Sequence, residues 1–186
     1  MSNPFFTIGH STRPIEEFVA LLKAAEVNLV VDVRTVPRSR TNPQFNSDVL
    51  PASLAPLGVA YEHLAALGGL RGKQPGVSPE LNAFWDNASF HNYADYAMSE
   101  TFRSSLEKLR EMGRASRLTV MCAEAVWWRC HRRIITDYLI AVGEEVFHIL
   151  GPGHVEEAHL TPAAVISPDG AITYPKDSQL TLDLSC

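Results

Sequence analysis

A short segment in the second half of the chain gathers side chains that could do chemistry. Its residues are Cys122, Glu124, Arg129, Cys130, His131, Arg132 and Arg133. A short apolar run ends at Cys122, which predicts a thiol at the carboxyl end of a buried strand. Cys130 opens a stretch with helical spacing, and the unpaired N–H groups of a helix start lower a thiol's pKa and attract anions. The segment therefore predicts thiol chemistry beside an anion-binding site.

The roles within this segment stay open. Either thiol could be the nucleophile, with Glu124 or His131 moving the proton. A buried cysteine also serves as a small hydrophobic residue, and His131 could simply cap the helix. Trp127 and Trp128 could stack on a planar ligand, or they could cover a core edge or a contact between subunits.

A second basic cluster follows the strand predicted at residues 29–33, where Arg34 stands directly after the apolar run. A buried arginine needs an anionic partner, which here is a ligand, Asp32 or Glu124. We interpret Asp32 as a structural carboxylate that accepts N–H bonds from the loop. Arg34, Arg40 and Arg132 are the arginines that we expect to hold an anion.

The elements that position these residues alternate along the chain. Strands are predicted at residues 5–9, 29–33, 59–61, 118–122 and 146–150, and helices at residues 15–22, 47–57, 93–112 and 134–142. Such alternation predicts a three-layer α/β fold with a mainly parallel sheet of about five strands and helices on both faces. A hairpin is expected around Asp169 and Gly170. Because we find no internal repeat or linker, we interpret residues 1–186 as a single α/β domain.

The ends of all five predicted strands carry residues suited to binding. They are His10, Arg34, His63, Cys122 and His154. In open parallel sheets, ligands bind outside the carboxyl ends of the strands. We therefore expect His10, Arg34 and Cys122 to share one site.

The composition narrows the class of protein. The chain has 186 residues, is 46% hydrophobic and 20% charged, and carries a formal net charge of −5. This charge argues against binding extended nucleic acid, whereas a basic pocket in an acidic protein suits a small anionic ligand. No apolar run approaches the roughly 20 residues of a membrane span, and the first residues do not resemble a signal peptide. With three cysteines there is no disulfide framework, so we expect a cytoplasmic protein. The oligomeric state stays open, a homodimer included.

Several familiar sites do not fit. The glycines and lysine of residues 68–74 lack the spacing and the Ser or Thr of a phosphate-binding loop, and no GxGxxG follows the first strand. Cys122 and Cys130 are farther apart than paired zinc ligands usually are. The arginine of a phosphatase loop would stand at position 128, which is Trp128. We expect no metal and no cofactor.

The order of motifs resembles the domain of unknown function 488 family. The resemblance covers residues 7 to about 150 and leaves residues 155–186 uncovered as a C-terminal extension. The motif positions by this resemblance are His10, Ser11, Arg13, Asp32, Arg34, Ser39, Arg40, Cys122, Glu124, Cys130, His131 and Arg132. The family name assigns no reaction, so the resemblance implies a compact α/β domain and a shared set of site residues. Where this chain has Val126, Trp127 and Trp128, the family commonly has a charged loop with a proline.

Three functions are compatible with this pattern. The favoured one is an enzyme with a basic, thiol-containing pocket for a small anionic substrate, phosphorylated or nucleotide-like. Cys122, Glu124, Cys130 and His131 would carry the chemistry, and His10, Ser11, Arg13, Arg34, Arg40 and Arg132 would bind the substrate. The alternatives are a non-catalytic anion-binding sensor module and a sulfurtransferase. The latter rests on an analogy with rhodanese-like domains, in the VVDVR strand and the cysteine at a strand end.

Overall fold

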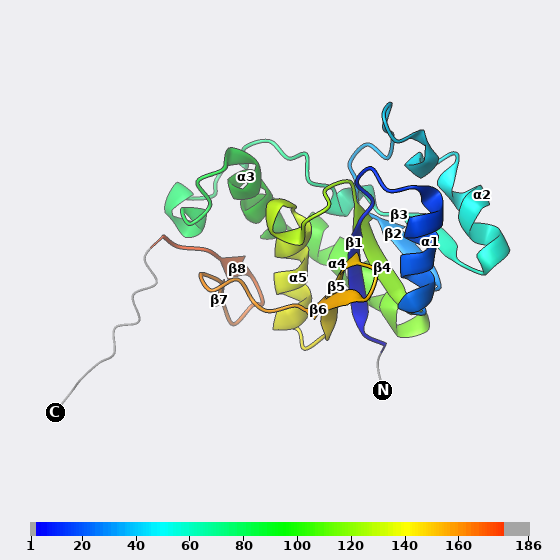
Figure 1. Ribbon diagram of the computed structural model, residues 1–186. Coiled ribbons are helices and arrows are strands. Elements are labelled where there is room, and N and C mark those ends of the chain that lie inside the picture. Colours follow the sequence, from blue (N-terminus) through cyan, green and yellow to red (C-terminus); the bar gives the residue numbers. More distant parts are fainter. Residues whose placement is uncertain (1–2, 177–186) are drawn as a thin grey trace.

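Five short strands form a parallel sheet in the computed structural model, which describes residues 3–176 (Figure 1). These strands are β1 (Phe5–Gly9), β2 (Leu29–Asp32), β3 (Ala60–His63), β4 (Leu118–Cys122) and β5 (Val146–Gly151). A sixth strand, β6 (His154–Glu157), pairs antiparallel with β5 and lies at the edge of the sheet. The order is β3-β2-β4-β1-β5-β6. The predicted α/β fold is confirmed, with one antiparallel strand that the sequence pattern did not reveal.

The three central strands explain why the site forms at one edge. Every residue of β1, β2 and β4 is buried, as expected for parallel strands that are covered on both faces. Gly9 pairs with Cys122, and Asp32 pairs with Met121. The carboxyl ends of these strands therefore lie side by side, and the loops that leave them meet there.

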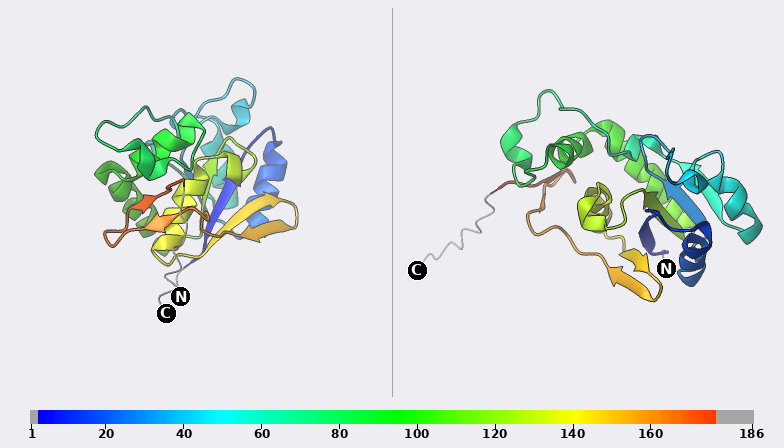
Figure 2. Two further views of the ribbon diagram at one scale, coloured as in Figure 1. Left: turned by 90° about the vertical axis from the view of Figure 1, so that its left-hand side faces the viewer. Right: turned by 45° about the horizontal axis from the view of Figure 1, so that its top comes forward.

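Helices cover both faces of the sheet (Figures 1 and 2). On one face, α1 (Ile15–Ala24) and α2 (Leu50–Leu54) enclose a core that includes Ile8 and Val30. On the other face, α4 (Glu100–Ala115) and α5 (Arg132–Ala141) pack with α3 (Ala88–Ala97) around a second core.

The long helix predicted at residues 93–112 is wrong, because the structure has two helices there. Helix α3 starts at Ala88, where the side chain of Asn87 accepts bonds from the N–H groups of Ser89 and Phe90. Helix α4 starts after Ser99, whose hydroxyl accepts the N–H of Phe102. Both are side-chain caps, and the cap at Ser99 lies within the predicted apolar pattern and starts a second helix there.

The weak helix predicted at residues 47–57 consists of α2 followed by the 3-10 turn η2 (Ala55–Leu57). Further 3-10 turns occur in the connections. They are η1 (Pro43–Phe45), η3 (Ala65–Leu67), η4 (Pro79–Asn82) and η5 (Trp127–Arg129). Of these, η5 lies within the loop that joins the two cysteines.

The hairpin expected around Asp169 and Gly170 is confirmed as β7 (Val165–Ile166) and β8 (Ile172–Thr173). Gly170 takes the positive φ of 83° that such a turn requires. Ile172 and Tyr174 are fully buried, and both belong to the core beneath α3 and α5. Within residues 3–176, no helix has the length and apolar character needed to cross a bilayer.

Candidate functional site

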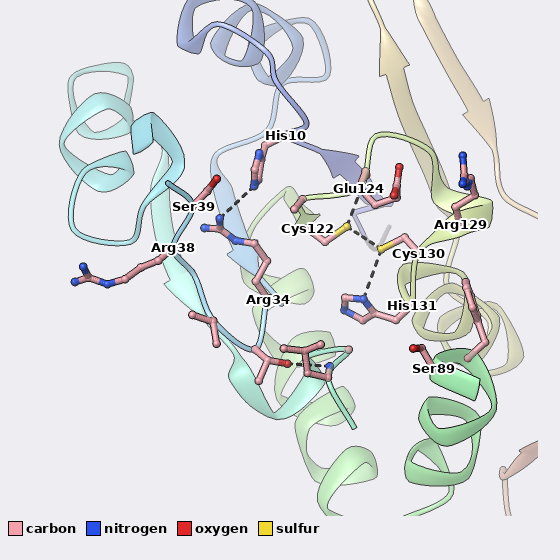
Figure 3. Close-up of a pocket in the computed structure, with 16 residues that line it drawn as sticks. His10, Arg34, Arg38, Ser39, Ser89, Cys122, Glu124, Arg129, Cys130 and His131 are labelled. Atoms are coloured by element: carbon pink, nitrogen blue, oxygen red, sulfur yellow. Dashed lines mark hydrogen bonds between the residues drawn. The ribbon is translucent and has the colours of Figure 1, made fainter. Parts of the chain in front are cut away.

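A cavity of about 420 Å³ opens at the carboxyl ends of β1, β2 and β4 (Figure 3). Its lining contains both thiols together with basic, acidic and apolar side chains. The lining residues include His10, Arg34, Val36, Arg38, Leu70, Phe90, Cys122, Glu124, Arg129, Cys130 and His131. The expectation that His10, Arg34 and Cys122 share one edge of the sheet is confirmed.

The two cysteine sulfurs are in contact. Cys122 ends β4, and Cys130 lies between η5 and α5, so the loop of residues 123–129 brings them back together. Their Sγ atoms are 2.8 Å apart, and both residues are free thiols that are at most 5% exposed. One thiol can therefore donate a hydrogen bond to the other.

The arginine behind this pair pairs with no carboxylate in the part of the chain that the structure describes. Arg132 is only 1% exposed, and within residues 3–176 it forms no ion pair with an aspartate or glutamate. Its Nη1 donates to the Thr7 hydroxyl, and its Nη2 donates to the carbonyl oxygen of Glu124 at 2.6 Å. Its Nε lies 3.4 Å from the Cys130 Sγ. A buried guanidinium needs a negative partner, and the Cys130 sulfur is the group in contact with it that can supply one.

The pKa values of the two thiols are shifted in opposite directions. Although burial opposes the thiolate, the hydrogen bond from Cys122 and the charges of His131 and Arg132 hold the pKa of Cys130 well below its ordinary value. Burial raises the pKa of Cys122 well above the ordinary value, and the hydrogen bond to Cys130 raises it further. Of the two thiols, Cys130 is therefore the one that loses its proton more readily, and its sulfur can accept a hydrogen bond from Cys122.

His131 joins the thiol pair to the end of β2. Its Nε2 is 3.3 Å from the carbonyl oxygen of Val33, which can only accept, so Nε2 carries a hydrogen. Its Nδ1 is 3.5 Å from the Cys130 Sγ. The ring also meets Tyr93 edge to face. These contacts fix the imidazole where it can take a proton from the thiol or return one.

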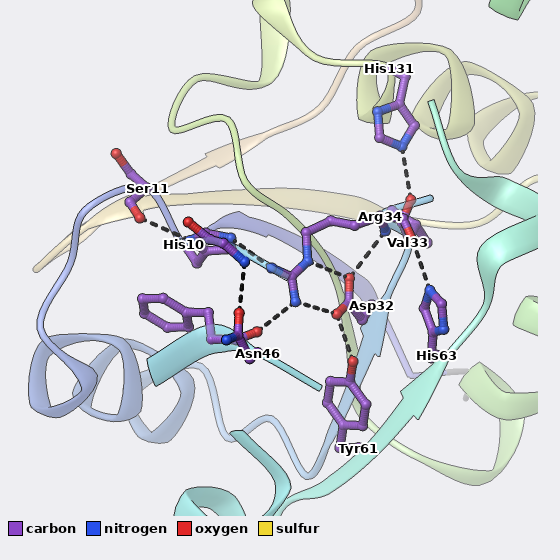
Figure 4. A network of polar contacts seen from close by, with 11 residues as sticks. His10, Ser11, Asp32, Val33, Arg34, Asn46, Tyr61, His63 and His131 are labelled. Carbon is purple, nitrogen blue, oxygen red and sulfur yellow. Dashed lines mark hydrogen bonds and ion pairs between the residues drawn. The ribbon is translucent and has the colours of Figure 1, made fainter. Parts of the chain in front are cut away.

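A second buried network holds Arg34 (Figure 4). The Nε and Nη2 of Arg34 donate to the two carboxylate oxygens of Asp32 at 2.9 and 2.6 Å, and Nη2 also donates to the carbonyl oxygen of Phe45. Tyr61 donates its hydroxyl to Asp32 at 2.6 Å. Of the partners that the sequence left open for Arg34, the structure shows Asp32. Despite burial, which acts in the opposite direction, Asp32 raises the pKa of Arg34 and keeps the guanidinium charged.

His10 completes this network as a neutral ring. Burial lowers its pKa to about 4, and the charge of Arg34 acts in the same direction. Its Nδ1 donates to the carbonyl oxygen of Ser11 at 2.8 Å, so its Nε2 accepts from Arg34 Nη1 at 3.1 Å. The ring stacks on Phe45 with 4.4 Å between centroids.

Two glycines allow the site loops to approach closely. A Cβ at Gly9 would stand 1.8 Å from the carbonyl oxygen of Glu124, and a Cβ at Gly69 would stand 2.6 Å from Nδ1 of His131. A larger residue at either position would displace the chain or ring that it meets. The loop after η3 therefore forms a wall of the cavity against His131.

The other predicted site residues differ in whether they line the cavity. Glu124 is exposed at the cavity wall, on the same side as Arg129 in Figure 3. Ser11 follows His10 with a φ of 48°, and Arg13 is bound to Glu17 and to the carbonyl oxygen of Leu150. Neither Ser11 nor Arg13 lines the cavity. Arg40 lines a neighbouring hollow with Arg38 and Ser39.

Some lining residues were not expected from the sequence. Ser89 and Phe90 reach the cavity because α3 begins five residues earlier than the predicted helix, at a cap that Asn87 would have signalled. Leu70 lines the opening on the loop that Gly69 permits. Trp127 instead stacks on His148 at 4.5 Å, which is the core-edge role among those left open for it.

Within residues 3–176, no group of three or more His, Cys, Asp and Glu side chains could hold a metal ion.

Comparison with known proteins agrees with this arrangement of motifs. The model of the domain of unknown function DUF488 matches residues 14–139, about two thirds of the chain. The chain belongs to the DUF488 family. The DUF488 match includes β2, β4 and most of α5, and hence both cysteines, although it is narrower than the resemblance seen from residue 7. No curated protein and no solved structure matches the chain.

Proposed function

We propose that this DUF488 protein is an enzyme in which the Cys130 thiolate attacks a small anionic substrate. The observation that carries the proposal is the buried Arg132 guanidinium, which contacts Cys130 Sγ and pairs with no carboxylate within residues 3–176. A thiolate is the nucleophilic form of cysteine. A cysteine that only fills space in the core needs neither a negative charge nor a place at a cavity wall.

The cavity lining suggests the kind of substrate. Arg129 and Arg38 stand at the exposed rim, and His131 lies beside the sulfur. These groups would hold a negative charge, while Arg34 in the lining and Arg132 behind it add positive potential. Val36, Leu70 and Phe90 offer apolar surface. We therefore propose a substrate with one anionic group on a partly apolar body, which includes a phosphorylated or nucleotide-like molecule.

Proton movement falls to His131 or Glu124. His131 is 3.5 Å from the sulfur and is fixed by Val33, so it can return a proton to a leaving group. The Glu124 carboxylate is exposed at the same cavity and could activate water in a later step.

Alkylation with a matched pair of reagents tests this proposal. Iodoacetate and iodoacetamide both label thiolates, but only iodoacetate is an anion. At about pH 6.5, Cys130 is expected to label faster than a free cysteine peptide, whose pKa is about 8.5, and to favour iodoacetate. An Arg129→Met variant should lose the preference for iodoacetate and keep its reaction with iodoacetamide. Peptide mapping that finds both cysteines labelled only after unfolding would contradict the proposal.

The low exposure of both sulfurs supports one second candidate, a module that binds an anion without reaction. In that case Cys130→Ser would keep the rise in melting temperature that phosphate or sulfate gives to the wild type, and no substrate would form a covalent adduct. Turnover or a covalent adduct on Cys130 with an anionic substrate would exclude this candidate.

A further inference from the structure

A nucleophilic thiolate does not by itself require a second thiol, yet Cys122 touches Cys130. We propose that Cys122 and Cys130 form a dithiol–disulfide couple that exchanges disulfide bonds with a small anionic disulfide bound in the cavity. This inference rests on the proposed function, in which Cys130 is the attacking thiolate. It adds the reaction class and a role for Cys122.

The geometry places Cys122 where it can resolve an adduct on Cys130. The two sulfurs are 2.8 Å apart, and a disulfide bond is about 2.05 Å long. Both sulfurs reach the same cavity wall, Cys122 from the end of β4 and Cys130 from the start of α5. The sulfurs are therefore less than about 1 Å farther apart than in a disulfide bond.

The exchange runs in two balanced steps. The Cys130 thiolate attacks one sulfur of the disulfide RS–SR, which forms Cys130–S–SR and releases RS⁻ as the S–S bond breaks. Cys122 then gives its proton to water and attacks the Cys130 sulfur. This step forms the Cys122–Cys130 disulfide and releases the second RS⁻. The protein dithiol loses two electrons, and RS–SR gains them.

The residues around the pair also affect the equilibrium between the dithiol and the disulfide of Cys122 and Cys130. Arg132 and His131 stabilise the Cys130 thiolate, which exists only in the reduced protein. Stabilising the reduced form makes the disulfide more easily reduced. The oxidised pair should therefore pass its disulfide readily to small thiols, and the reduced pair should react best with disulfides whose thiols are good leaving groups.

The cavity favours a disulfide that carries negative charge. Its volume of about 420 Å³ suits a small molecule, and Arg129 stands at the rim with Phe90 and Leu70 among the apolar lining. An aromatic disulfide with carboxylates, such as 5,5′-dithiobis(2-nitrobenzoate), matches these features and releases a coloured thiolate. It serves as the probe.

The experiment uses the full chain with Cys186→Ser, so that only the pair reacts. With the reduced folded protein at neutral pH, we expect two coloured thiolates per chain and a product that has lost two hydrogens and carries no aryl group by mass. In the additional variant Cys122→Ser, we expect one coloured thiolate and a stable aryl adduct on Cys130. In Cys130→Ser, the reaction should be at least tenfold slower, because Cys122 is the neutral thiol.

The outcomes separate this inference from the proposed function. A wild-type pair that keeps the aryl adduct on Cys130 would overturn the couple and leave the nucleophile in place. Release that needs unfolding in every variant would overturn both. A matched test with the uncharged reagent 2,2′-dithiodipyridine checks the substrate class. Arg129→Met should slow the reaction with the anionic disulfide and not with the neutral one. If the wild type and Arg129→Met react with the anionic disulfide at equal rates, the substrate class is not anionic.

Discussion

At the residue scale, the site contains two buried arginines that differ in their partners. Arg34 has Asp32, whereas Arg132 has a sulfur, two neutral oxygens and no carboxylate within residues 3–176. Since both arginines are buried, the difference supports the proposal that Cys130 carries a negative charge. Neither Arg13, bound to Glu17, nor the exposed Arg38 has such a role.

Replacing Arg132 tests this assignment. Arg132→Met should raise the pKa of Cys130 by about 1–2 units, because a hydrogen bond to a charged group contributes about 1.5–3 kcal/mol. The pH dependence of alkylation measures the change, and Arg132→Lys should restore part of it if Met impairs folding. Arg129→Met is the control, since Arg129 stands at the rim and makes no contact with the sulfur among the described residues. Equal midpoints in the Arg132 and Arg129 variants would contradict the assignment.

The ion pair of Asp32 and Arg34 is expected to stabilise the fold. Asp32→Asn should lower the free energy of unfolding by about 3–5 kcal/mol, because it leaves a buried guanidinium without its charge partner. Asp48→Asn is the matched control, because its pair with Arg38 is exposed and should contribute less than about 1 kcal/mol. Urea denaturation of both variants decides. Similar small losses would mean that Arg34 has another anionic partner.

His10 predicts a pH dependence of stability. Its pKa is about 4 in the folded protein and about 6.5 in the unfolded chain, so the unfolded state binds more protons between these values. The free energy of unfolding should therefore fall as the pH decreases from about 6.5 to about 4. Burial also lowers the pKa of His148, to about 3, and acts in the same direction. Denaturation at several pH values should show a smaller loss in His10→Gln than in the wild type. An identical loss would show that His10 does not titrate in this way.

At the element scale, strand ends and loop approaches form the site. The strand pattern predicted where Cys122 ends, and the spacing after Cys130 predicted α5, so the sequence placed both thiols at element ends correctly. It did not predict the break between α3 and α4, because the apolar spacing continues through Ser99 while the hydroxyl of Ser99 caps the start of a new helix. Contacts such as Gly69 against His131 depend on tertiary approach, which no local pattern encodes.

That contact can be tested with two glycines of the same loop. Gly69→Ala should push the His131 ring away from Cys130 and reduce alkylation at about pH 6.5 several-fold, because the Cβ would lie 2.6 Å from Nδ1. Gly72→Ala is the control, since a Cβ there meets nothing within 4 Å. Unchanged alkylation in Gly69→Ala, with a normal melting curve, would show that His131 does not support the thiolate.

At the scale of the whole molecule, the DUF488 chain is an α/β fold with a cavity at the carboxyl edge of its sheet. Strand alternation was enough to predict the layers and the shared edge of His10, Arg34 and Cys122. The pairing of charges was not predictable, because a ligand, Asp32 and Glu124 were all possible partners for Arg34 until the side chains were placed. The separation of the two sulfurs depends likewise on how the loop of residues 123–129 folds back.

The most direct measurement is a titration of thiolate absorbance in the folded protein. The Cys186→Ser chain is compared with the same chain carrying Cys130→Ser, from about pH 9 down to about pH 4. We expect a thiolate that persists well below about pH 8.5, the range of a free cysteine, and that is missing from the Cys130→Ser protein. A transition at or above about pH 8.5 in the folded Cys186→Ser chain would show that Cys130 is a neutral, buried thiol and not a nucleophilic thiolate.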